Sequence, residues 1–577
     1  MLGDRWICDR VPTDRFPDYT RGNAGEVLAD PVSPLAWSFC WEPGPVQGCV
    51  DGFEQMGVFD RIEYGDPPAS FGLFGGYFYN SLTQARLFGI RSGAGWEAVD
   101  KTYYDGTSQE IPPYIEADWH IDECKTKKLV ATMAWVSTTE SVPEVELQKL
   151  EAKSLRDSRP DIGSQTDEQL VARAVSIQRH LRVQFASVVW ASMGSSVGPG
   201  VLPALLGEIE PDAIAKLMTG IGDVDSTGIA SRIFDISRIV RGSADLTAAF
   251  DGDLDGLLDR LDTGGTPEAQ RLLAAVVDFM YEHGGRGPNE WDVYQRSYET
   301  NPTMLLQAIE RTRHAADDAD PARSLARGVA ERQRLIDKYE GEFAGNEEAL
   351  GAFQTAVRTL QVWMGARERV KSSNIRCHNE VRICFDELGR RMVERGHLEH
   401  AQQFYMLLAE ELDDFLANPG SFTARLAERE QDYLSLYDLE PPYIVNGVVP
   451  PLREWKRRGE GEYKRVQVGD VLTGVAGSPG DATGTARVML DLSDPTVLQP
   501  GDILIAPSTD PSWTPLFLIA EGVITDIGAV GTHAVIVSRE LGIPCVPSIA
   551  DASKRIPTGA TITINGGLGT VTIDALP

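Results

Sequence analysis

The hydrophobic pattern of this chain changes sharply near residue 467, and the change limits which domains it can form. Between residues 144 and 433, apolar side chains recur at helical spacing, as in Val381, Cys384 and Phe385. Beyond residue 467, short β-branched runs alternate with helix-like segments. The pattern therefore predicts a multidomain protein, with a large and mainly α-helical domain followed by a compact α/β domain.

Short runs in the last part of the chain have the composition of β-strands. They span residues 485–490, 503–506, 523–526, 545–546, 561–564 and 570–573. The last two runs flank Asn-Gly-Gly-Leu-Gly at residues 565–569, which is a strong hairpin signal. Residues 515–520 and 533–541 have helical patterns between strands. This unit, at about 110 residues, is large enough to be a domain.

The remaining segments are a mixed N-terminal part and a linker. The first 140 residues are rich in Gly, Pro and aromatic residues, with strand-like runs such as residues 129–136, and indicate mixed α/β structure. Residues 441–466 join proline pairs to a charged stretch, which is typical of an interdomain linker; a loop packed on the helical domain is the alternative for its first half. We therefore expect an acceptor-binding domain at residues 1–440 and a second domain at residues 467–577.

Residues 183–207 carry no charged side chain and are long enough to raise the question of a membrane span. Small polar residues and glycines around Ser195, together with Pro199 and Pro203, weaken a continuous apolar helix. We expect a buried helix, a break and a second helix, without a membrane span.

The charge balance and the cysteines exclude several classes of protein. With 54 Lys and Arg residues against 85 Asp and Glu residues, the formal net charge is −31, which repels nucleic acid and anionic membranes. The seven cysteines are spread along the chain without a Cys-x-x-Cys motif, so neither a disulfide framework nor a metal site is expected. The N-terminus lacks a signal-peptide pattern, and we expect a cytoplasmic protein.

His533 is the candidate catalytic residue, and it lies where a strand-like run meets a helix-like run. Gly528 and Gly531 flank the turn and allow it to be tight. Thr532 can cap the helix, whose free N–H groups favour an anion beside the imidazole, such as a phosphoryl group. Taken alone, Thr532 and His533 also fit a helix cap followed by a surface histidine without a catalytic role.

The surrounding sequence resembles the swivelling phosphohistidine domain of the PEP-utilising enzymes. The resemblance rests on Gly-Ser-Pro-Gly at residues 477–480, on residues 500–517 and on residues 523–546. It implies that His533 accepts a phosphoryl group and carries it to an acceptor, with Thr532 bonding the imidazole or the phosphoryl oxygens. Ala529 and Thr532 stand where the family usually has Gly and Ser.

Two earlier regions resemble the substrate-binding domain of the rifampin phosphotransferase family. The first comprises residues 23–28, 31–38 and 75–80, and it implies that Asn23, Glu26 and Trp37 bind the acceptor.

The second region, residues 283–292, resembles a Gly-His-Arg…Glu-x-Asp element of the same domain. It implies catalytic roles for Arg286 and His283 and a substrate-binding role for Glu290. A guanidinium suits phosphoryl oxygens because it is always charged and donates in a fork. The alternative for Arg286 is a structural ion pair with Glu290, one helical turn away.

No stretch resembles an ATP-grasp domain or a PEP-binding barrel, and Lys-Ser-Ser at residues 371–373 falls inside a helical pattern. By resemblance to split phosphotransferases, ATP and Mg²⁺ would be bound by a separate ATP-grasp partner subunit. This chain, which would bind no cofactor tightly itself, would then transfer the phosphoryl group from phospho-His533 to a small hydrophobic hydroxylated substrate, such as a phenol or cresol. A component of an antibiotic (rifamycin-type) phosphotransferase and a non-catalytic binding protein are the alternatives.

The acceptor hydroxyl needs a base, and histidine is the side chain that titrates near neutral pH. The histidines considered for this role are His120, His283, His378, His397 and His400. A core or surface histidine without a catalytic role is the alternative for each.

Overall fold

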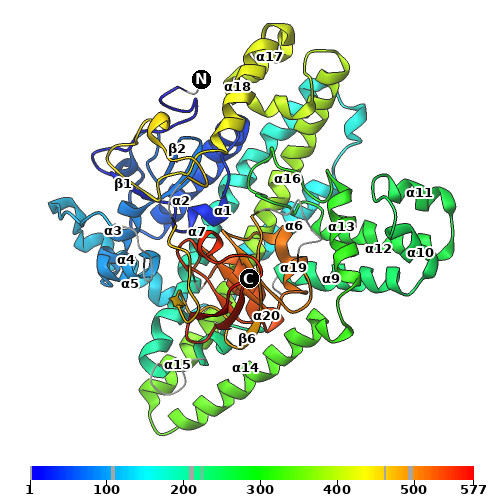
Figure 1. Cartoon of the computed structure of the whole chain (residues 1–577). Coiled ribbons are helices and arrows are strands. Elements are labelled where there is room, and N and C mark those ends of the chain that lie inside the picture. Colours follow the sequence, from blue (N-terminus) through cyan, green and yellow to red (C-terminus); the bar gives the residue numbers. More distant parts are fainter. Residues whose placement is uncertain are drawn as a thin grey trace.

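The computed structural model describes residues 3–104, 111–206, 213–221, 225–460, 463–490, 498–529 and 531–577. The described chain forms an N-terminal α/β lobe, a body of long helices, a helical side lobe and a C-terminal α/β domain. Figure 1 shows the C-terminal domain seated among the other three parts.

A four-stranded antiparallel sheet organises the N-terminal lobe, in the order β2-β3-β1-β4. Its strands are β1 (Asp18–Thr20), β2 (Phe71–Phe74), β3 (Tyr77–Ser81) and β4 (Ile444–Asn446). Strand β4 comes from the predicted linker and pairs with β1, and the buried Trp455 packs against Gly75. The first half of the segment is thus packed on the N-terminal lobe, whereas the alternative interpretation placed it on the helical domain.

Short helices surround this sheet. They are α1 (Ala24–Val27), the π-helix η1 (Ala36–Val46), α2 (Gln47–Gln55), η2 (Arg61–Tyr64), α3 (Leu82–Ser92), α4 (Trp96–Tyr104) and η3 (Asp118–His120). Buried aromatic side chains fill the space between sheet and helices, and Trp41 contacts Phe78 and Trp291 at ring-centroid distances of 4.6 and 5.8 Å.

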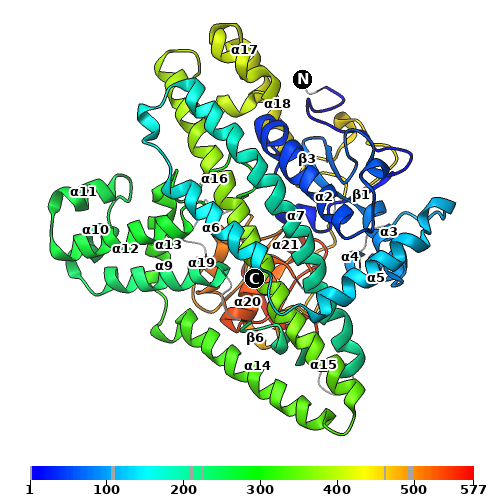
Figure 2. The same cartoon turned by 180° about the vertical axis from the view of Figure 1, so that it is seen from behind.

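The helical body lies beside this lobe, with its long helices in the middle of the molecule (Figure 2). Its elements are α5 (Glu123–Thr138), α6 (Pro143–Asp157), η4 (Ile162–Ser164), α7 (Asp167–Leu206), α8 (Ala213–Leu217), α14 (Pro321–Phe343), α15 (Glu347–Thr359), η6 (Leu360–Met364), α16 (Gly365–Glu394), η7 (Ala401–Met406), η8 (Ala409–Glu411), α17 (Leu412–Ala417), η9 (Pro419–Ser421) and α18 (Thr423–Leu436). The short η10 (Leu452–Glu454) lies against the N-terminal lobe instead. The predicted apolar face of Val381, Cys384 and Phe385 is buried on α16, which confirms the helical periodicity.

The strand predicted at residues 129–136 is wrong, because this run lies inside α5. Asp122 caps the helix by accepting hydrogen bonds from the backbone N–H groups of Cys124 and Lys125. Leu129 and Val136, two turns apart, are its buried apolar contacts. The cap and the helical spacing therefore outweigh the β-branched composition of the run.

The break predicted within residues 183–207 is also wrong, because α7 continues through Pro199 and Pro203 to Leu206. Close packing of α7 explains why the segment has glycines. A Cβ atom on Gly194 would lie 2.3 Å from the Trp363 ring, and one on Gly198 would lie 2.5 Å from Leu360. The small residues permit close packing against η6.

By length and composition, α7 is also the one helix in the described chain that could cross a membrane. A core helix of a globular protein meets the same test. Here α7 packs against α2, α15 and α16, and Leu181, Gln184 and Phe185 are buried in those contacts.

A side lobe has its own hydrophobic core, formed by Ile229, Ile233, Phe279 and Leu305 with their neighbours. It consists of α9 (Asp225–Arg241), α10 (Ala244–Phe250), α11 (Leu257–Gly264), α12 (Pro267–His283) and α13 (Pro302–Arg313), and the short η5 (Asp317–Ala319) follows it. The loop between α12 and α13 runs from this lobe into the centre of the molecule.

The C-terminal domain is built on a seven-stranded sheet in the order β5-β11-β10-β6-β7-β8-β9. The elements are β5 (Val471–Thr473), β6 (Asp481–Val488), β7 (Asp502–Ala506), η11 (Pro511–Trp513), α19 (Thr514–Phe517), β8 (Gly522–Thr525), α20 (His533–Leu541), β9 (Cys545–Val546), α21 (Ala552–Arg555), β10 (Thr561–Asn565) and β11 (Thr570–Ala575). All six predicted strands and both predicted helices are present. The sequence prediction missed β5 and α21.

The C-terminal domain docks through the end that carries α19 and α20. Helix α20 contacts α14 and α9, and α19 contacts α13 and α9. At the centre, Phe234 and Leu518 share a small hydrophobic cluster. The docked arrangement places the start of α20 against the loop between α12 and α13 and against α16.

Candidate functional site

The start of helix α20 presents His533 as its first residue. The preceding turn uses Gly528 at φ 151°, a conformation that favours glycine. Thr532 occupies the N-cap position with extended backbone angles, as predicted, although its side chain forms no capping hydrogen bond. The hydroxyl oxygen of Thr532 is buried and has no hydrogen-bond partner among the described residues.

Two other threonines hold the His533 imidazole. The Thr509 hydroxyl lies 3.0 Å from Nδ1, and the Thr514 hydroxyl lies 3.3 Å from Nε2. The Phe517 ring packs edge-on to the imidazole at a centroid distance of 5.7 Å. The hydrogen bonds expected from Thr532 are thus supplied by Thr509 and Thr514, on the loop after β7 and on α19.

Burial lowers the pKa of His533 well below its usual value, and the positive charges of Lys371 and Arg286 lower it further. The imidazole is therefore neutral at physiological pH. A neutral imidazole keeps a nitrogen lone pair and can act as a nucleophile.

Basic side chains of the helical body face this imidazole. Arg286, on the loop after α12, forms a two-pronged ion pair with Glu290 at 2.6 and 3.1 Å and donates to the Ser372 hydroxyl at 3.2 Å. Lys371 lies 3.9 Å from the same Glu290 carboxylate. The predicted Arg286–Glu290 ion pair is therefore present, and it lies within the electrostatic range of His533.

A third basic side chain contacts the histidine loop directly. Arg367, one turn before Lys371 on α16, donates to the Gly531 carbonyl at 3.1 Å. Arg286, Arg367 and Lys371 together could neutralise a phosphoryl group on His533.

The loop at residues 284–292 is shaped by close packing. A Cβ atom on Gly287 would lie 2.4 Å from the Arg296 carbonyl oxygen, which requires glycine. Asn289 has a left-handed backbone, with φ 47°. Its side chain donates to Asp30 at 2.9 Å, and its backbone N–H donates to Asp510 at 3.3 Å. Asn289 thus links the N-terminal lobe to the C-terminal domain.

Glu26 lies against the histidine loop from the N-terminal side. A Cβ atom on Gly528 would be 3.3 Å from its Oε1, which is buried and has no hydrogen-bond partner among the described residues. Burial raises the pKa of Glu26 to about 8, against the smaller opposing effect of Arg367 and Lys371. Two of the predicted substrate-binding residues therefore lie at the site: Glu26 against the histidine loop and Glu290 on Arg286 and Lys371.

The other predicted site residues lie further out. Asn23 is exposed just before α1 and accepts a hydrogen bond from Asn80 at 3.4 Å. Trp37 is buried in the N-terminal core, where it stacks on Trp41 and donates to Glu42 at 3.0 Å. Acceptor binding by either residue stays a prediction.

His283 ends α12 and faces Gly228 of α9. Burial and then Arg286 lower the pKa of His283 to about 4. Its imidazole is near Arg286, yet its packing is on the side lobe. A catalytic role for His283 stays a prediction.

The remaining histidines considered as bases occupy other environments. His120 bonds the Tyr114 hydroxyl at 2.6 Å in the N-terminal lobe, and His400 pairs with Glu430 at 3.1 Å. His378 is buried on α16 and bonds the Asn374 carbonyl at 3.0 Å, and its pKa is lowered to about 4 by burial. His397 follows α16 in the segment before η7.

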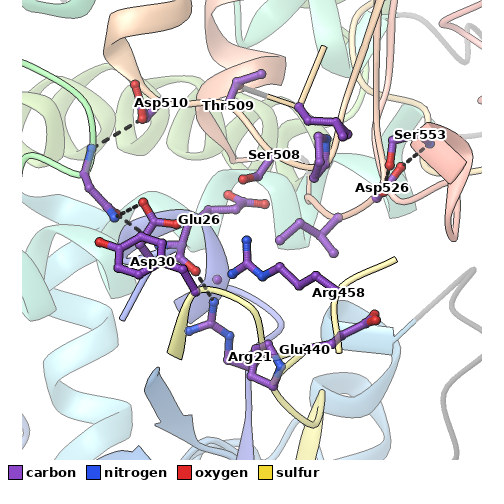
Figure 3. Close-up of a pocket in the computed structure, with 18 of the residues that line it drawn as sticks. Arg21, Glu26, Asp30, Glu440, Arg458, Ser508, Thr509, Asp510, Asp526 and Ser553 are labelled. Carbon is purple, nitrogen blue, oxygen red and sulfur yellow. Dashed lines mark hydrogen bonds between the residues drawn. The ribbon is translucent and has the colours of Figure 1, made fainter. Parts of the chain in front are cut away.

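A cavity of about 1570 Å³ lies between the N-terminal lobe, α13 and the C-terminal domain. Figure 3 shows Ser508, Thr509 and Asp510 on one side of it and Glu26, Asp30 and Arg458 on the other. Because Thr509 bonds His533 and Glu26 abuts Gly528, one end of the cavity adjoins the histidine. Aromatic rings, among them Tyr298, Tyr437 and Trp513, line the rest.

Sequence reasoning missed the residues that complete the site. Thr509 and Asp510 belong to the motif that carried the family resemblance, but no role was assigned to them. Arg367 and Lys371 are four residues apart in a helical pattern, which places two positive charges on one face. That spacing was the signal that could have identified them.

No cluster of three or more His, Cys, Asp or Glu side chains suited to a metal ion occurs in the part of the chain that the structure describes. The described cysteines are all free thiols.

The sequence matches two family descriptions in the regions that form this site. Residues 498–569 match the mobile domain of PEP-utilising enzymes, and residues 184–368 match the fourth domain of rifampicin phosphotransferase. This chain is a PEP-utilising family member. It resembles rifampicin phosphotransferase, and His533 lies in its mobile domain.

Several curated proteins that are similar to this chain are named as transferases. Rifampicin phosphotransferase of Bacillus subtilis (strain 168) is 27% identical over 52% of this chain and 34% of its own length. The prodigiosin synthesizing transferase PigC of Serratia marcescens is 31% identical over 51% of this chain and 33% of its own. Rifampicin phosphotransferase of a Streptomyces species is 26% identical over 62% of this chain and 41% of its own length. The matched part is thus about a third to two fifths of each relative.

Proposed function

We propose that this chain is the acceptor-binding and phosphohistidine-carrying part of an ATP-dependent phosphotransferase. The observation that carries the proposal is the position of His533. It is a neutral imidazole at a helix start, held by two hydroxyl groups and faced by Arg286, Arg367 and Lys371. Names of the curated relatives support a transferase reaction.

In this proposal an imidazole nitrogen of His533 receives a phosphoryl group, and the acceptor hydroxyl then attacks the phosphorus. Arg286 and Lys371 would neutralise the charge on the phosphoryl oxygens as the P–N bond breaks. Glu290 keeps these two side chains near the imidazole before the phosphoryl group arrives.

We also propose that ATP and Mg²⁺ bind to an ATP-grasp partner subunit, which transfers a phosphoryl group to His533. The support is the resemblance of this chain to split phosphotransferases, in which a separate subunit binds the nucleotide. The C-terminal domain would leave its docked position to reach that partner, in keeping with the mobile domain that it matches.

The acceptor is proposed to be an aromatic hydroxyl compound. Tyrosine and tryptophan rings on the cavity wall favour an aromatic acceptor. The cavity volume of about 1570 Å³ exceeds what a phenol or cresol needs, and so favours a larger, rifamycin-type acceptor as the second candidate.

Labelling tests the proposal at each step. Phosphoramidate, a small phosphoryl donor, should label wild-type protein on His533 and leave His533→Ala unlabelled. Radiolabelled ATP should do so only with an ATP-grasp protein present. The labelled protein is then offered phenol, cresol or a rifamycin, and the favoured acceptor takes the label. Labelling of His533→Ala, or no transfer to any hydroxyl compound, would contradict the proposal.

A further inference from the structure

Attack on phospho-His533 requires a group that takes the proton of the acceptor hydroxyl, and the histidines do not provide one at the cavity. We propose that Glu26 is this general base, and that the acceptor hydroxyl binds at the cavity end between Glu26 and Thr509. The inference rests on the proposed function and assigns a catalytic residue to it.

Position is the first argument. Glu26 lines the cavity from α1, while Thr509 lines it from the C-terminal domain and bonds the His533 ring. The Glu26 carboxyl group abuts Gly528, the glycine that begins the histidine turn. An acceptor in the cavity therefore meets Glu26 and the His533 loop at the same end.

The unused bonding capacity of Glu26 is the second argument. Its Oε1 is buried without a hydrogen-bond partner among the described residues, although a buried polar atom normally has one. Because Glu26 also lines the cavity, a hydroxyl group bound there could donate to its carboxyl group. Neighbouring acids are already engaged: Glu290 accepts from Arg286, and Asp510 accepts from Ser512 and Asn289.

Charge is the third argument. Arg367 and Lys371 of α16 lower the pKa of Glu26, and Glu26 in turn raises the pKa of Cys545 on β9. Burial outweighs the two basic residues and raises the pKa of Glu26 to about 8, near the value that suits a general base at neutral pH. Lys371 also acts on His533, which places the carboxyl group and the imidazole around one ammonium group.

The acceptor oxygen forms the new O–P bond while the P–N bond breaks, and the electron pair of that bond returns to the imidazole. The ring leaves neutral when its other nitrogen carries a proton. The hydroxyl proton moves to the Glu26 carboxylate, which releases it to solvent through the cavity.

The test is single-turnover transfer from protein loaded on His533 with phosphoramidate, so that no partner subunit is needed. Glu26→Gln keeps the shape and hydrogen-bonding length of the side chain but cannot take a proton. We expect it to load at the wild-type rate and to transfer to phenol at least about a hundredfold more slowly. With 4-nitrophenol, which is largely ionised near neutral pH, the loss should be less than about tenfold.

The pH profile provides a second readout. The wild-type rate with phenol should rise with pH through a midpoint near pH 8, where half of the Glu26 side chains are ionised. This rise should be absent in Glu26→Gln. Glu26→Asp, which retains a carboxyl group set further back, should recover part of both the rate and the profile.

Glu42→Gln is the matched control, because burial also raises the pKa of Glu42, but that residue pairs with Arg10 and Trp37 in the N-terminal lobe. It should behave as wild type. Equal losses of Glu26→Gln with phenol and 4-nitrophenol, or an unchanged pH profile, would overturn the assignment. Absence of transfer from the wild-type protein to either compound would instead count against the proposed function.

Discussion

At the scale of single residues, two hydroxyl groups set the orientation of the His533 ring. A neutral imidazole has one N–H and one lone pair, so one threonine hydroxyl accepts and the other donates. Thr509 makes the shorter contact, 3.0 Å to Nδ1, against 3.3 Å from Thr514 to Nε2. Thr509 therefore contributes most to holding the ring in one tautomer.

We predict that Thr509→Val slows the labelling of His533 by phosphoramidate about fivefold, the equivalent of about 1 kcal/mol for one hydrogen bond. Thr509→Ser keeps the hydroxyl group and should label at nearly the wild-type rate. Quench-flow measurement of phosphohistidine formation compares the two variants. Equal rates for the valine and serine variants would show that the hydroxyl has no such role.

The residues of the site differ in how far sequence could predict them. His533 was identified by its local turn and its motif, both of which are written in consecutive residues. Thr514 lies 19 positions before it, by subtraction of residue numbers, and reaches it through the fold of the C-terminal domain. Lys371 lies 162 positions before it, and only the docking of the C-terminal domain on α16 brings the two together. Such contacts have no local signature, which is why Thr532 was expected to do what Thr509 and Thr514 do.

At the scale of elements, α7 shows how packing overrides local signals. Glycines and prolines predicted a break in the helix, and the strand-like run in α5 predicted a strand. In both cases the observed helix is stabilised by other contacts. In α7, η6 packs against the glycines. In α5, the Asp122 cap and the buried Leu129 and Val136 stabilise the helix. The C-terminal strands were predictable because each is short, β-branched and bounded by turn residues.

Two glycines on α7 offer a matched pair of substitutions. A Cβ atom on Gly198 would lie 2.5 Å from Leu360 and 2.9 Å from the Ala356 carbonyl oxygen, whereas one on Gly200 would meet nothing within 4 Å. We predict that Gly198→Ala lowers the free energy of unfolding by about 1–3 kcal/mol. Gly200→Ala should leave it unchanged or raise it by up to about 1 kcal/mol, because alanine favours the helix.

Denaturant unfolding of both variants, followed by circular dichroism, measures the difference. The close packing of α7 against η6 would be contradicted if the two alanine variants were equally stable.

At the scale of the whole molecule, the docked position of the C-terminal domain depends on a few polar links. Asn289 joins Asp30 of the N-terminal lobe to Asp510 of the C-terminal domain, and the Gly220 N–H donates to Glu540 of α20 at 3.2 Å. Burial raises the pKa of Asp510 to about 6 and that of Glu540 to about 7. These buried carboxyl groups make docking less favourable once they ionise.

We predict that substitutions of Asn289 shift the molecule towards an extended, undocked form. Asn289→Gly tolerates the left-handed backbone and keeps the N–H to Asp510, but it loses the side-chain bonds to Asp30 and Ala29. Asn289→Asp in addition places a carboxylate between two acids and should undock the domain further. Small-angle X-ray scattering should give radii of gyration in the order wild type, Gly, Asp, and three equal radii would rule out this role for Asn289.

The strand β4 has a consequence for any partner of this protein. Pairing of β4 with β1, and the hydrogen bond from the Arg458 N–H to the Asp438 carbonyl, anchor the chain to the N-terminal lobe, while Val466 already bonds Arg555 of the C-terminal domain. At about 3.5 Å per residue, the connecting segment from Arg458 to Val466 spans at most about 28 Å. Larger displacements of His533 have to come from rotation of the C-terminal domain about this short segment. The proposed nucleotide-binding partner would therefore have to place its phosphate donor on the side of the molecule where Arg458 lies.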